Sequence, residues 1–201
     1  MELKQVLLTT AYLPNVQYIS QVFKNDEVFI EAHENFVKQT YRNRCDILTS
    51  NGKLSLSIPL VKQADKEIIT SKRISYAENW QQQHWRAITS AYKNSPYFEF
   101  FEDEFKPFYH QQYDYLFDFN LQLLKTVLHI LRVKKTIYLT SEYQPKVSNY
   151  YDCRQLTEKT SENINVKPYY QQFAVKYGFT PNLSCIDLLF NEGLYALDYL
   201  I

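Results

Sequence analysis

The sequence predicts an α/β fold, with a mainly parallel, Rossmann-like sheet, a hairpin and flanking helices, in a single domain over residues 1–201. The first reason is a strand–helix–strand unit near the N-terminus, because a helix that joins two strands favours parallel pairing. The second reason is Asn51-Gly52, a strong signal of a tight turn between antiparallel strands. A chain of 201 residues is also long enough to bury a substantial core.

The N-terminal half of the chain supplies most of the predicted strands. Short apolar and β-branched runs predict strands, whereas apolar residues at a spacing of three or four predict a helix. Asn15 is a suitable N-cap for that helix. Leu54, Leu56 and Ile58 alternate with serines, as a half-buried strand requires. The expected elements are strands at 6–10 and 28–31, the helix at 16–23, paired strands at 47–48 and 54–61, and a weaker strand at 68–74.

From residue 79 onwards the pattern becomes helical. Trp80, His84 and Ile88 share one helical face, and Pro96 ends that helix. Ser184 and Asp187 have the spacing of a capping box, which opens a helix. The expected elements are helices at 80–92, 116–131 and 184–191, a short helix or packed loop at 97–108, a strand at 136–139, one short helix within 151–165, a connector at 168–179, and a last turn at 194–200 after a C-cap at Gly193.

The charge balance and the cysteines restrict the class of protein. Lys plus Arg and Asp plus Glu both number 22, so the chain offers no broad electrostatic footprint for nucleic acid or an anionic membrane. Cys45, Cys153 and Cys185 form neither a disulfide framework nor a metal-binding pair, as expected in a reducing cytoplasm. The chain has no signal-peptide pattern and no apolar stretch of about 20 residues, so we expect a cytoplasmic protein with no membrane span. A homo-oligomer is compatible with the sequence.

Glycine and histidine usage excludes several kinds of site. The three glycines, Gly52, Gly178 and Gly193, are far apart, whereas dinucleotide-binding, P-loop and kinase loops each need two or more close together. His33 begins a segment that resembles a zinc-protease motif, but Val37 stands where the second histidine belongs. The sequence therefore predicts neither a metal site nor a cofactor.

A cationic segment is the best candidate binding site. Lys38, Tyr41, Asn43 and Arg44 follow a predicted strand, and open α/β sheets bind ligands beyond their strand ends. The ammonium and guanidinium groups would hold a phosphate or carboxylate, which Tyr41 and Asn43 would orient. We expect Arg44 to be substantially buried and to donate several hydrogen bonds into a cleft. The alternative is an extended surface segment with solvated charges.

Other candidates have structural explanations beside the functional ones. Tyr12 lies between a strand and a helix N-terminus, where backbone N–H groups attract anions, but turn and capping chemistry also explains it. Trp80 and His84 would form an aromatic wall with a general acid–base group, since an unperturbed histidine titrates near neutrality. The alternative for them is a core-facing helix. Ser184 and Asp187 have the chemistry of a nucleophile and its base, although capping accounts for their spacing.

Several segments, taken in order, resemble the WbqC-like protein family. Tyr12-Leu13-Pro14 resembles the family's opening Tyr-Leu-Pro. Lys38, Thr40-Tyr41 and Asn43-Arg44 resemble its Lys-x-Ser-Tyr-x-Asn-Arg signature. The pieces are individually weak, but their order is specific and covers nearly the whole chain. The remaining matches are Leu56 to Pro59, Trp80, His84, Tyr92, Pro96-Tyr97-Phe98, Leu139 to Glu142, Tyr170-Gln171-x-Phe173, and 184–193.

The resemblance implies a function in surface polysaccharides of bacteria. A family member of this kind is expected to be a transferase of O-antigen-type biosynthesis that acts on an activated or phosphorylated sugar. Its small-molecule substrate would be a nucleotide-linked sugar, and no nucleic acid would be bound. The residues expected to bind the substrate are Tyr12, Lys38, Tyr41, Asn43, Arg44 and Trp80, with His84 as the catalytic residue.

One departure from the family pattern motivates a second hypothesis. Many family members have His-Gln-Pro before the Tyr-Leu-Pro, and here Leu8-Thr9-Thr10 occupies those positions. If that histidine is catalytic in other members, this chain lacks it. The second hypothesis is therefore a non-catalytic binding or assembly protein of a glycan pathway, with the aromatic stretch 97–108 as its partner surface.

Overall fold

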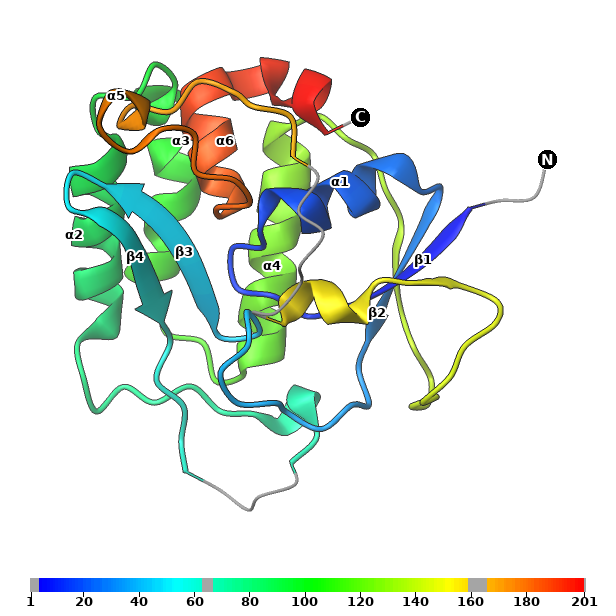
Figure 1. The fold of residues 1–201 in the computed structure, drawn as a ribbon. Coiled ribbons are helices and arrows are strands. Elements are labelled where there is room, and N and C mark those ends of the chain that lie inside the picture. Colours follow the sequence, from blue (N-terminus) through cyan, green and yellow to red (C-terminus); the bar gives the residue numbers. More distant parts are fainter. Residues whose placement is uncertain (1–3, 63–66, 159–165, 201) are drawn as a thin grey trace.

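The computed structural model describes residues 4–62, 67–158 and 166–200 and has a mixed α/β architecture (Figure 1). Its main sheet contains four parallel strands in the order β5-β2-β1-β6. Val6 lies opposite Val28 in the register of β1 and β2, which confirms the predicted parallel pairing. The strands are β1 (Gln5–Thr9), β2 (Glu27–Glu31), β5 (Ile137–Leu139) and β6 (Tyr151–Asp152).

Helix α1 (Val16–Lys24) connects β1 to β2 and begins where the sequence predicts. The Asn15 side chain accepts a hydrogen bond from the Tyr18 backbone N–H at 2.9 Å. It thereby satisfies one of the donors that the first turn of a helix leaves free. Ile19 and Val22 are buried on the face that packs into the core, so the apolar spacing predicts the correct face.

A separate antiparallel hairpin consists of β3 (Arg44–Thr49) and β4 (Gly52–Ser57). Gly52 has a φ of +96°, in a region that favours glycine, and the predicted tight turn is confirmed. At the other end of the hairpin, Arg44 lies opposite Ser57. This register decides which side chains flank the open end of the hairpin, where the chain continues into loops.

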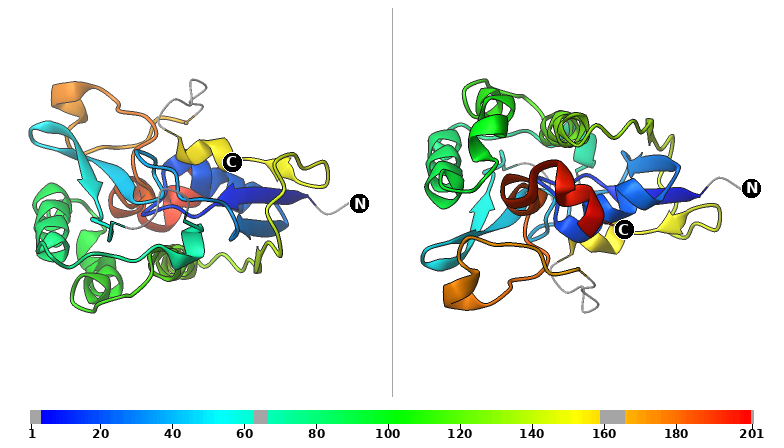
Figure 2. Two further views of the ribbon diagram at one scale, coloured as in Figure 1. Left: turned by 90° about the horizontal axis from the view of Figure 1, so that it is seen from below. Right: turned by 90° about the horizontal axis from the view of Figure 1, so that it is seen from above.

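The helices pack around the hairpin and the sheet. Figure 2 shows α6 in the middle of the molecule, with the green helices on one side of it. Residues 185–191 of α6 are all buried, as expected for a central helix. The helices are α2 (Trp80–Tyr92), α3 (Phe98–Phe105), α4 (Leu116–Ile130), α5 (Ala174–Tyr177) and α6 (Cys185–Glu192), with short 3₁₀ helices η2 (Lys106–Tyr109) and η4 (Gly193–Tyr199).

Residues 68–74 do not form the strand that their apolar residues suggest. They contain the 3₁₀ helix η1 (Ile69–Ser71), which is flanked by two isolated bridges, Asn35 with Ile68 and Leu60 with Ile74. Ile69 and Ile74 are nevertheless buried. The apolar pattern therefore identifies the buried side chains but not the backbone conformation.

Residues 151–165 contain the expected short helix, but they also contain a strand that was not predicted. The segment supplies the edge strand β6, which pairs with β1 over two residues, and then the 3₁₀ helix η3 (Arg154–Thr157). A two-residue strand is too short to produce an alternating pattern in the sequence. Residues 159–165 lie outside the described ranges. In the expected connector 168–179, the short helix α5 is an addition to the prediction.

The predicted capping box at the start of α6 does not form, although the helix begins at the predicted place. The Ser184 hydroxyl donates to the Leu13 carbonyl at 2.8 Å instead of capping its own helix. The Asp187 carboxylate accepts hydrogen bonds from the Tyr92 and Tyr169 hydroxyls at 2.8 and 2.7 Å. Tertiary partners therefore replace the local ones, and they attach α6 to the β1–α1 loop and to α2.

A single cluster of buried hydrophobic residues runs from Val6 to Leu200. Aromatic side chains contribute strongly, and Trp80, Tyr12, Phe119 and Phe190 are among the largest fully buried ones. This agrees with the high Tyr and Phe content of the sequence. In residues 4–62, 67–158 and 166–200, no helix is both long and apolar enough to cross a membrane.

Candidate functional site

The predicted cationic segment forms one wall of a pocket of about 610 Å³, here called the hairpin pocket. The pocket lies at the open end of the β3–β4 hairpin, beyond the carboxyl end of β2. Three of the predicted binding residues, Lys38, Asn43 and Arg44, line it together. The structure adds Lys62 and Lys72 to the cations, Glu67 as a carboxylate, Gln39 and Ser57, and an apolar wall of Phe36, Ile58, Pro59, Leu60 and Val61.

Arg44 and Asn43 carry polar atoms that have no partner among the described residues. Arg44 is half-buried, and its Nε is buried with no hydrogen-bond partner in the described chain. Asn43 is 8% exposed; its Nδ2 donates to the Ile58 carbonyl at 2.8 Å, while its Oδ1 is buried without a partner. Native interiors satisfy nearly all such groups, so each of these atoms calls for a water or a ligand. The hydrogen bonds predicted for Arg44 are not made to described protein groups.

Lys72 and Glu67 form an ion pair inside the hairpin pocket. Lys72 Nζ lies 2.8 Å from Glu67 Oε2, and the two side chains are only 9% and 13% exposed. The same ammonium group lies 5.6 Å from the centre of the Phe36 ring. A buried lysine is costly without a counter-ion, so Glu67 supplies the anionic partner that the site has in this conformation.

Arg42, in the middle of the same segment, points away from the pocket and into the protein. Its Nε and Nη2 donate to the two carboxylate oxygens of Glu34 at 2.8 and 2.6 Å. Burial raises the pKa of Glu34, and the Arg42 guanidinium opposes this shift. The Arg42 carbonyl accepts from Asn120 of α4. Sequence reasoning missed this buried pair, because nothing local shows which arginine of the segment faces the core.

Tyr41 and Tyr12 lie next to each other but do not line the hairpin pocket. The Tyr12 N–H donates to the Tyr41 carbonyl at 3.0 Å, and the Tyr41 hydroxyl donates to Asp46 Oδ2 at 2.9 Å. Burial and the Asp46 carboxylate raise the pKa of Tyr41. Tyr12 is fully buried. In this conformation neither side chain contacts a ligand in the pocket, so their expected binding roles stay predictions.

His84 and Trp80 face the core, as their structural alternative proposes. The Tyr12 hydroxyl lies 2.9 Å from His84 Nδ1, and the His84 and Trp80 rings meet edge-on with centroids 5.1 Å apart. Burial lowers the pKa of His84 to about 4, and a hydrogen bond with the Ser57 backbone opposes the shift. His84 is therefore neutral at physiological pH. Because Ser57 lines the hairpin pocket, His84 supports the pocket wall from behind.

The aromatic stretch 97–108 does not form the exposed patch expected for a partner surface. Phe98 and Phe105 are 2% exposed and belong to the core, and Phe101 packs against it. Phe100 is the exposed phenylalanine of the stretch, at 75%. Helix α3 therefore uses most of its aromatic residues for packing.

Two other places were candidates by position. In a parallel sheet with this strand order, the crevice between the carboxyl ends of β1 and β6 is a usual ligand site. Here Thr9 and Thr157 fill it, with their hydroxyl oxygens 2.9 Å apart.

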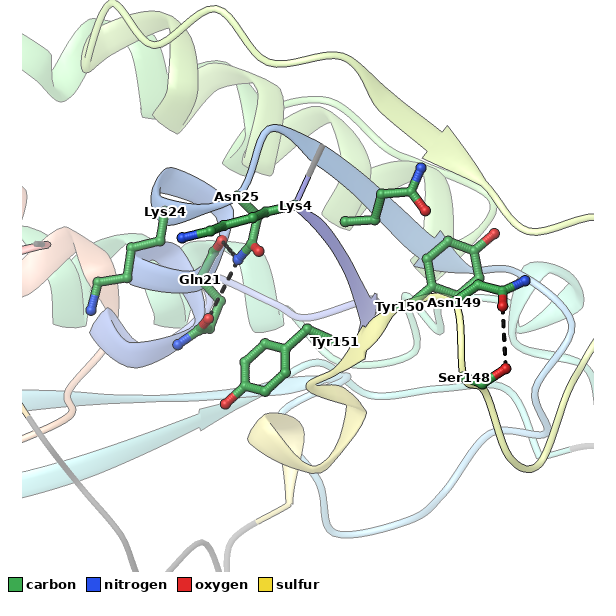
Figure 3. A pocket seen from close by; sticks show the side chains of 9 residues that line it. Lys4, Gln21, Lys24, Asn25, Ser148, Asn149, Tyr150 and Tyr151 are labelled. Atoms are coloured by element: carbon green, nitrogen blue, oxygen red, sulfur yellow. Dashed lines mark hydrogen bonds between the residues drawn. The ribbon is translucent and has the colours of Figure 1, made fainter. Parts of the chain in front are cut away.

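A second concave region of about 510 Å³ lies at the opposite, amino end of β1 and β6 (Figure 3). Among the described residues, no group of three His, Cys, Asp or Glu side chains could hold a metal ion.

Comparison with known proteins identifies relatives. The profile of the WbqC-like protein family matches residues 10–163. The chain is 26% identical to "Uncharacterized protein Rv1507c" of Mycobacterium tuberculosis (strain ATCC 25618 / H37Rv). The alignment spans 226 residues and covers 98% of this chain and 97% of the relative. No solved structure matches the chain significantly.

Proposed function

Since the chain belongs to the WbqC-like protein family, we propose that it is a bacterial transferase of surface-polysaccharide biosynthesis that binds an activated or phosphorylated sugar in the hairpin pocket. The observation that supports this most is the convergence of Lys38, Asn43 and Arg44 on one pocket. These residues match the family signature, and their functional groups are suited to an anionic, hydroxyl-bearing ligand. The proposal places the protein in the cytoplasm, where nucleotide-linked sugars are made.

The binding step follows from the chemistry of the pocket. Arg44 offers a planar donor fork whose Nε lacks a partner, and this geometry suits a phosphate. The unpartnered Oδ1 of Asn43 accepts a hydrogen bond, as a sugar hydroxyl can donate. A volume of 610 Å³ is within the range of sites for small molecules, and the apolar wall gives a base or sugar ring a surface to pack on.

The transfer step needs a group that moves a proton. Among the described residues, Glu67 and the lysines are the acid–base groups that line the pocket in this conformation. His84 keeps its proposed catalytic role only if the pocket wall rearranges, because Ser57, whose backbone bonds to His84, lines the pocket and His84 does not. Otherwise His84 acts as a positioning residue that holds the end of β4 in place.

The fold supports a Rossmann-like interpretation of the parallel sheet. Counted within this sheet, the strands follow the order third, second, first, fourth, which is the order of the first four strands in the doubly wound dinucleotide-binding fold. The usual crevice is filled by the Thr9–Thr157 contact, and no glycine-rich loop follows β1. We infer that the ligand site lies in the hairpin pocket instead, where Arg44 and the lysines of the flanking loops take the place of backbone N–H groups.

A non-catalytic binding protein of a glycan pathway is the second candidate, and one observation favours it. His84, the predicted proton carrier, does not line the pocket that holds the predicted anion-binding residues. In that case the hairpin pocket binds the same class of ligand without changing it. The two functions therefore share the binding step and differ in turnover.

Thermal-shift screening against nucleotides, nucleotide sugars and sugar phosphates tests the binding step. We expect at least one of these compounds to raise the melting temperature of the wild type. The shift should shrink in Arg44→Lys and persist in Arg86→Lys, which changes an exposed arginine of α2 outside the pocket. If folded wild-type protein responds to none of them, the proposal is wrong. Incubation of a bound nucleotide sugar with glycan acceptors then separates a transferase, which releases nucleotide, from a binding protein.

A further inference from the structure

The concave region at the amino end of β1 and β6 has an unusual lining, and we call it the amide groove. Carboxamide side chains dominate it, contributed by Gln5 of β1, Gln21 and Asn25 at the end of α1, and Asn149 before β6. None of the described residues that line it carries a carboxylate. Its volume of about 510 Å³ is comparable to that of the hairpin pocket.

An exposed tyrosine ring forms one side of the amide groove. Tyr150 and Tyr151 are consecutive, and side chains alternate across a strand, so the two rings point in different directions (Figure 3). Tyr150 packs on the Phe29 ring, with centroids 4.7 Å apart. Tyr151 remains 62% exposed and lines the groove with Gln21. Its ring therefore has a face that no described protein group covers.

Several polar groups in the groove have unused hydrogen-bonding capacity. Gln21 Oε1 accepts from Asn25 at 3.5 Å, whereas Gln21 Nε2 has no partner in the described part of the chain. Asn149 Oδ1 accepts from the Ser148 hydroxyl at 3.2 Å, which leaves the Asn149 amide N–H₂ group available. Gln5 is already bound to Glu27 at 2.6 Å. Gln21 lies on the same side of β6 as the Tyr151 ring, whereas Asn149 lies beside Tyr150 on the other side of the strand (Figure 3). The free donor of Gln21 and the Tyr151 hydroxyl are therefore the groups next to the exposed ring.

The lysines at the groove indicate that its ligand is negatively charged. The exposed side chains of Lys4 and Lys24 both line it, and the Lys135 ammonium group donates to the backbone carbonyl of Asn25. Carboxamides both donate to and accept from hydroxyls, and an aromatic ring packs on the C–H face of a sugar. We propose that the amide groove binds an acidic oligosaccharide: carboxamides and Tyr151 hold the sugar, and the lysines hold its acidic groups.

This site is distinct from the hairpin pocket. It lies at the amino ends of parallel strands, whereas the reacting sites of open α/β sheets lie at the carboxyl ends. The groove also lacks an acid–base pair among its described residues. The amide groove is therefore a site that binds a glycan chain without catalysing a reaction. This proposal does not depend on which ligand the hairpin pocket binds.

Calorimetric titration of the full chain with short oligogalacturonates, and in parallel with neutral malto-oligosaccharides, tests the proposal. We expect the acidic series to bind more tightly. Tyr151→Ala should weaken binding of the acidic series about five- to tenfold through the lost ring contact. Tyr195→Ala is the matched control, since Tyr195 is similarly exposed, at 65%, but lies outside the groove. Lys24→Gln should weaken the acidic series alone.

Three results would overturn the proposal. The first is no binding of either series by folded protein. The second is equal binding by the wild type and Tyr151→Ala. The third is displacement of the oligogalacturonate by inorganic polyphosphate at the same charge concentration, which would show electrostatic attraction without sugar recognition. Arg44→Lys should leave oligogalacturonate binding unchanged, so failure of this proposal and failure of the hairpin-pocket proposal are distinguishable.

Discussion

Arg42 and Arg44 are two positions apart and serve different partners. Arg42 makes a bidentate ion pair with Glu34 in the interior, while Arg44 faces the hairpin pocket with an unpartnered Nε. The first contact fixes the segment beyond β2 to the core. The second arginine lines the pocket and keeps a buried donor without a partner among the described residues. One short segment thus combines a buried anchor with a residue of the proposed binding site, and the anchor helps to position that residue.

The first prediction concerns Arg44. Replacing it with lysine keeps the charge but removes the planar fork, so affinity for the phosphorylated ligand found by screening should fall by about 1–3 kcal/mol. Stability should change little, because Arg44 has no described protein partner. Calorimetric titration measures the affinity, and urea unfolding measures the stability. Unchanged affinity in Arg44→Lys would remove the central member of the proposed site.

The second prediction concerns Glu67. Its carboxylate pairs with the Lys72 ammonium group and therefore competes with a phosphate for that cation. Glu67→Gln removes the competing charge, so an anionic ligand should bind several-fold more tightly. The free protein should lose about 1–3 kcal/mol of stability, since Lys72 is left buried without its counter-ion. Titration with the same ligand at low salt checks the affinity. Weaker binding would mean that Glu67 contacts the ligand itself.

At the scale of elements, α2 and α6 carry two buried groups whose pKa values shift in opposite directions. Burial lowers the pKa of His84 on α2 from 6.5 to about 4. Burial raises the pKa of Asp187 on α6 from 3.8 to about 6, although Tyr169, Tyr92 and Gln171 donate hydrogen bonds to it. His84 therefore contributes stability that is lost as pH falls from 6.5 to 4. Asp187 contributes stability that is present below 3.8 and lost as pH rises through 6.

The third prediction separates these two contributions. Each shift corresponds to about 3 kcal/mol across its window. Relative to the wild type, His84→Gln should gain stability when the pH falls from about 7 to about 4, because it lacks the histidine that resists protonation. Asp187→Asn should lose stability relative to the wild type over the same change. Urea unfolding at both pH values measures the differences, and the same sign for both variants would contradict the assignment.

The end of α6 gives the fourth prediction. Gly193 and Gly178 have φ values of +60° and +70°, so alanine is strained at both. A Cβ at Gly193 would also lie 2.6 Å from the Tyr97 ring, whereas nothing lies within 4 Å of one at Gly178. Gly178→Ala should cost about 1–2 kcal/mol, and Gly193→Ala about 2 kcal/mol more. Urea unfolding measures both; equal losses would show that Tyr97 moves freely.

Periodic elements could be predicted from the sequence, and elements held by tertiary contacts could not. Helices α1, α2 and α4 bury the faces that their apolar spacing indicates. Strand β6 has two residues and exists only because β1 offers backbone partners. The capping box at Ser184 fails because Leu13 and two tyrosines bind its side chains instead.

The candidate site shows the same limit. The signature residues Lys38, Asn43 and Arg44 could be found from the sequence, because they are close together along the chain. Lys72 and Glu67 could not, because the apolar pattern of 68–74 suggests a strand and not the 3₁₀ turn that precedes Lys72 at the pocket.

On the scale of the whole molecule, α6 links the parts of the structure. The Ser184 N–H donates to the Asp46 carbonyl of β3, and the Cys185 N–H donates to the Pro14 carbonyl. Phe190 is fully buried against rings of α2 and α3. The family match ends at residue 163, before this helix. The packing therefore indicates that the matched region needs the C-terminal segment to complete its core.

The fifth prediction tests that dependence. A chain that ends at residue 165 should not unfold cooperatively in urea, because it lacks the central helix. Phe190→Ala in the full chain should cost about 3–5 kcal/mol, as expected for a large aromatic in a core. Val175→Asp, in the same segment but fully exposed, should be within about 0.5 kcal/mol of the wild type. Cooperative unfolding of the shortened chain would show that residues 1–165 fold alone.

The parallel sheet is bordered by its shortest strands. β5 has three residues and β6 has two, while the central strands β1 and β2 have five each. In the hairpin, strand β4 carries Lys53 near its start and serines at positions 55 and 57. Short and charged edges offer few backbone groups to a neighbouring molecule, which is how natural sheets avoid aggregation. The described strand edges therefore offer little backbone for sheet extension, and contacts between copies of the chain would have to be made by side-chain surfaces instead.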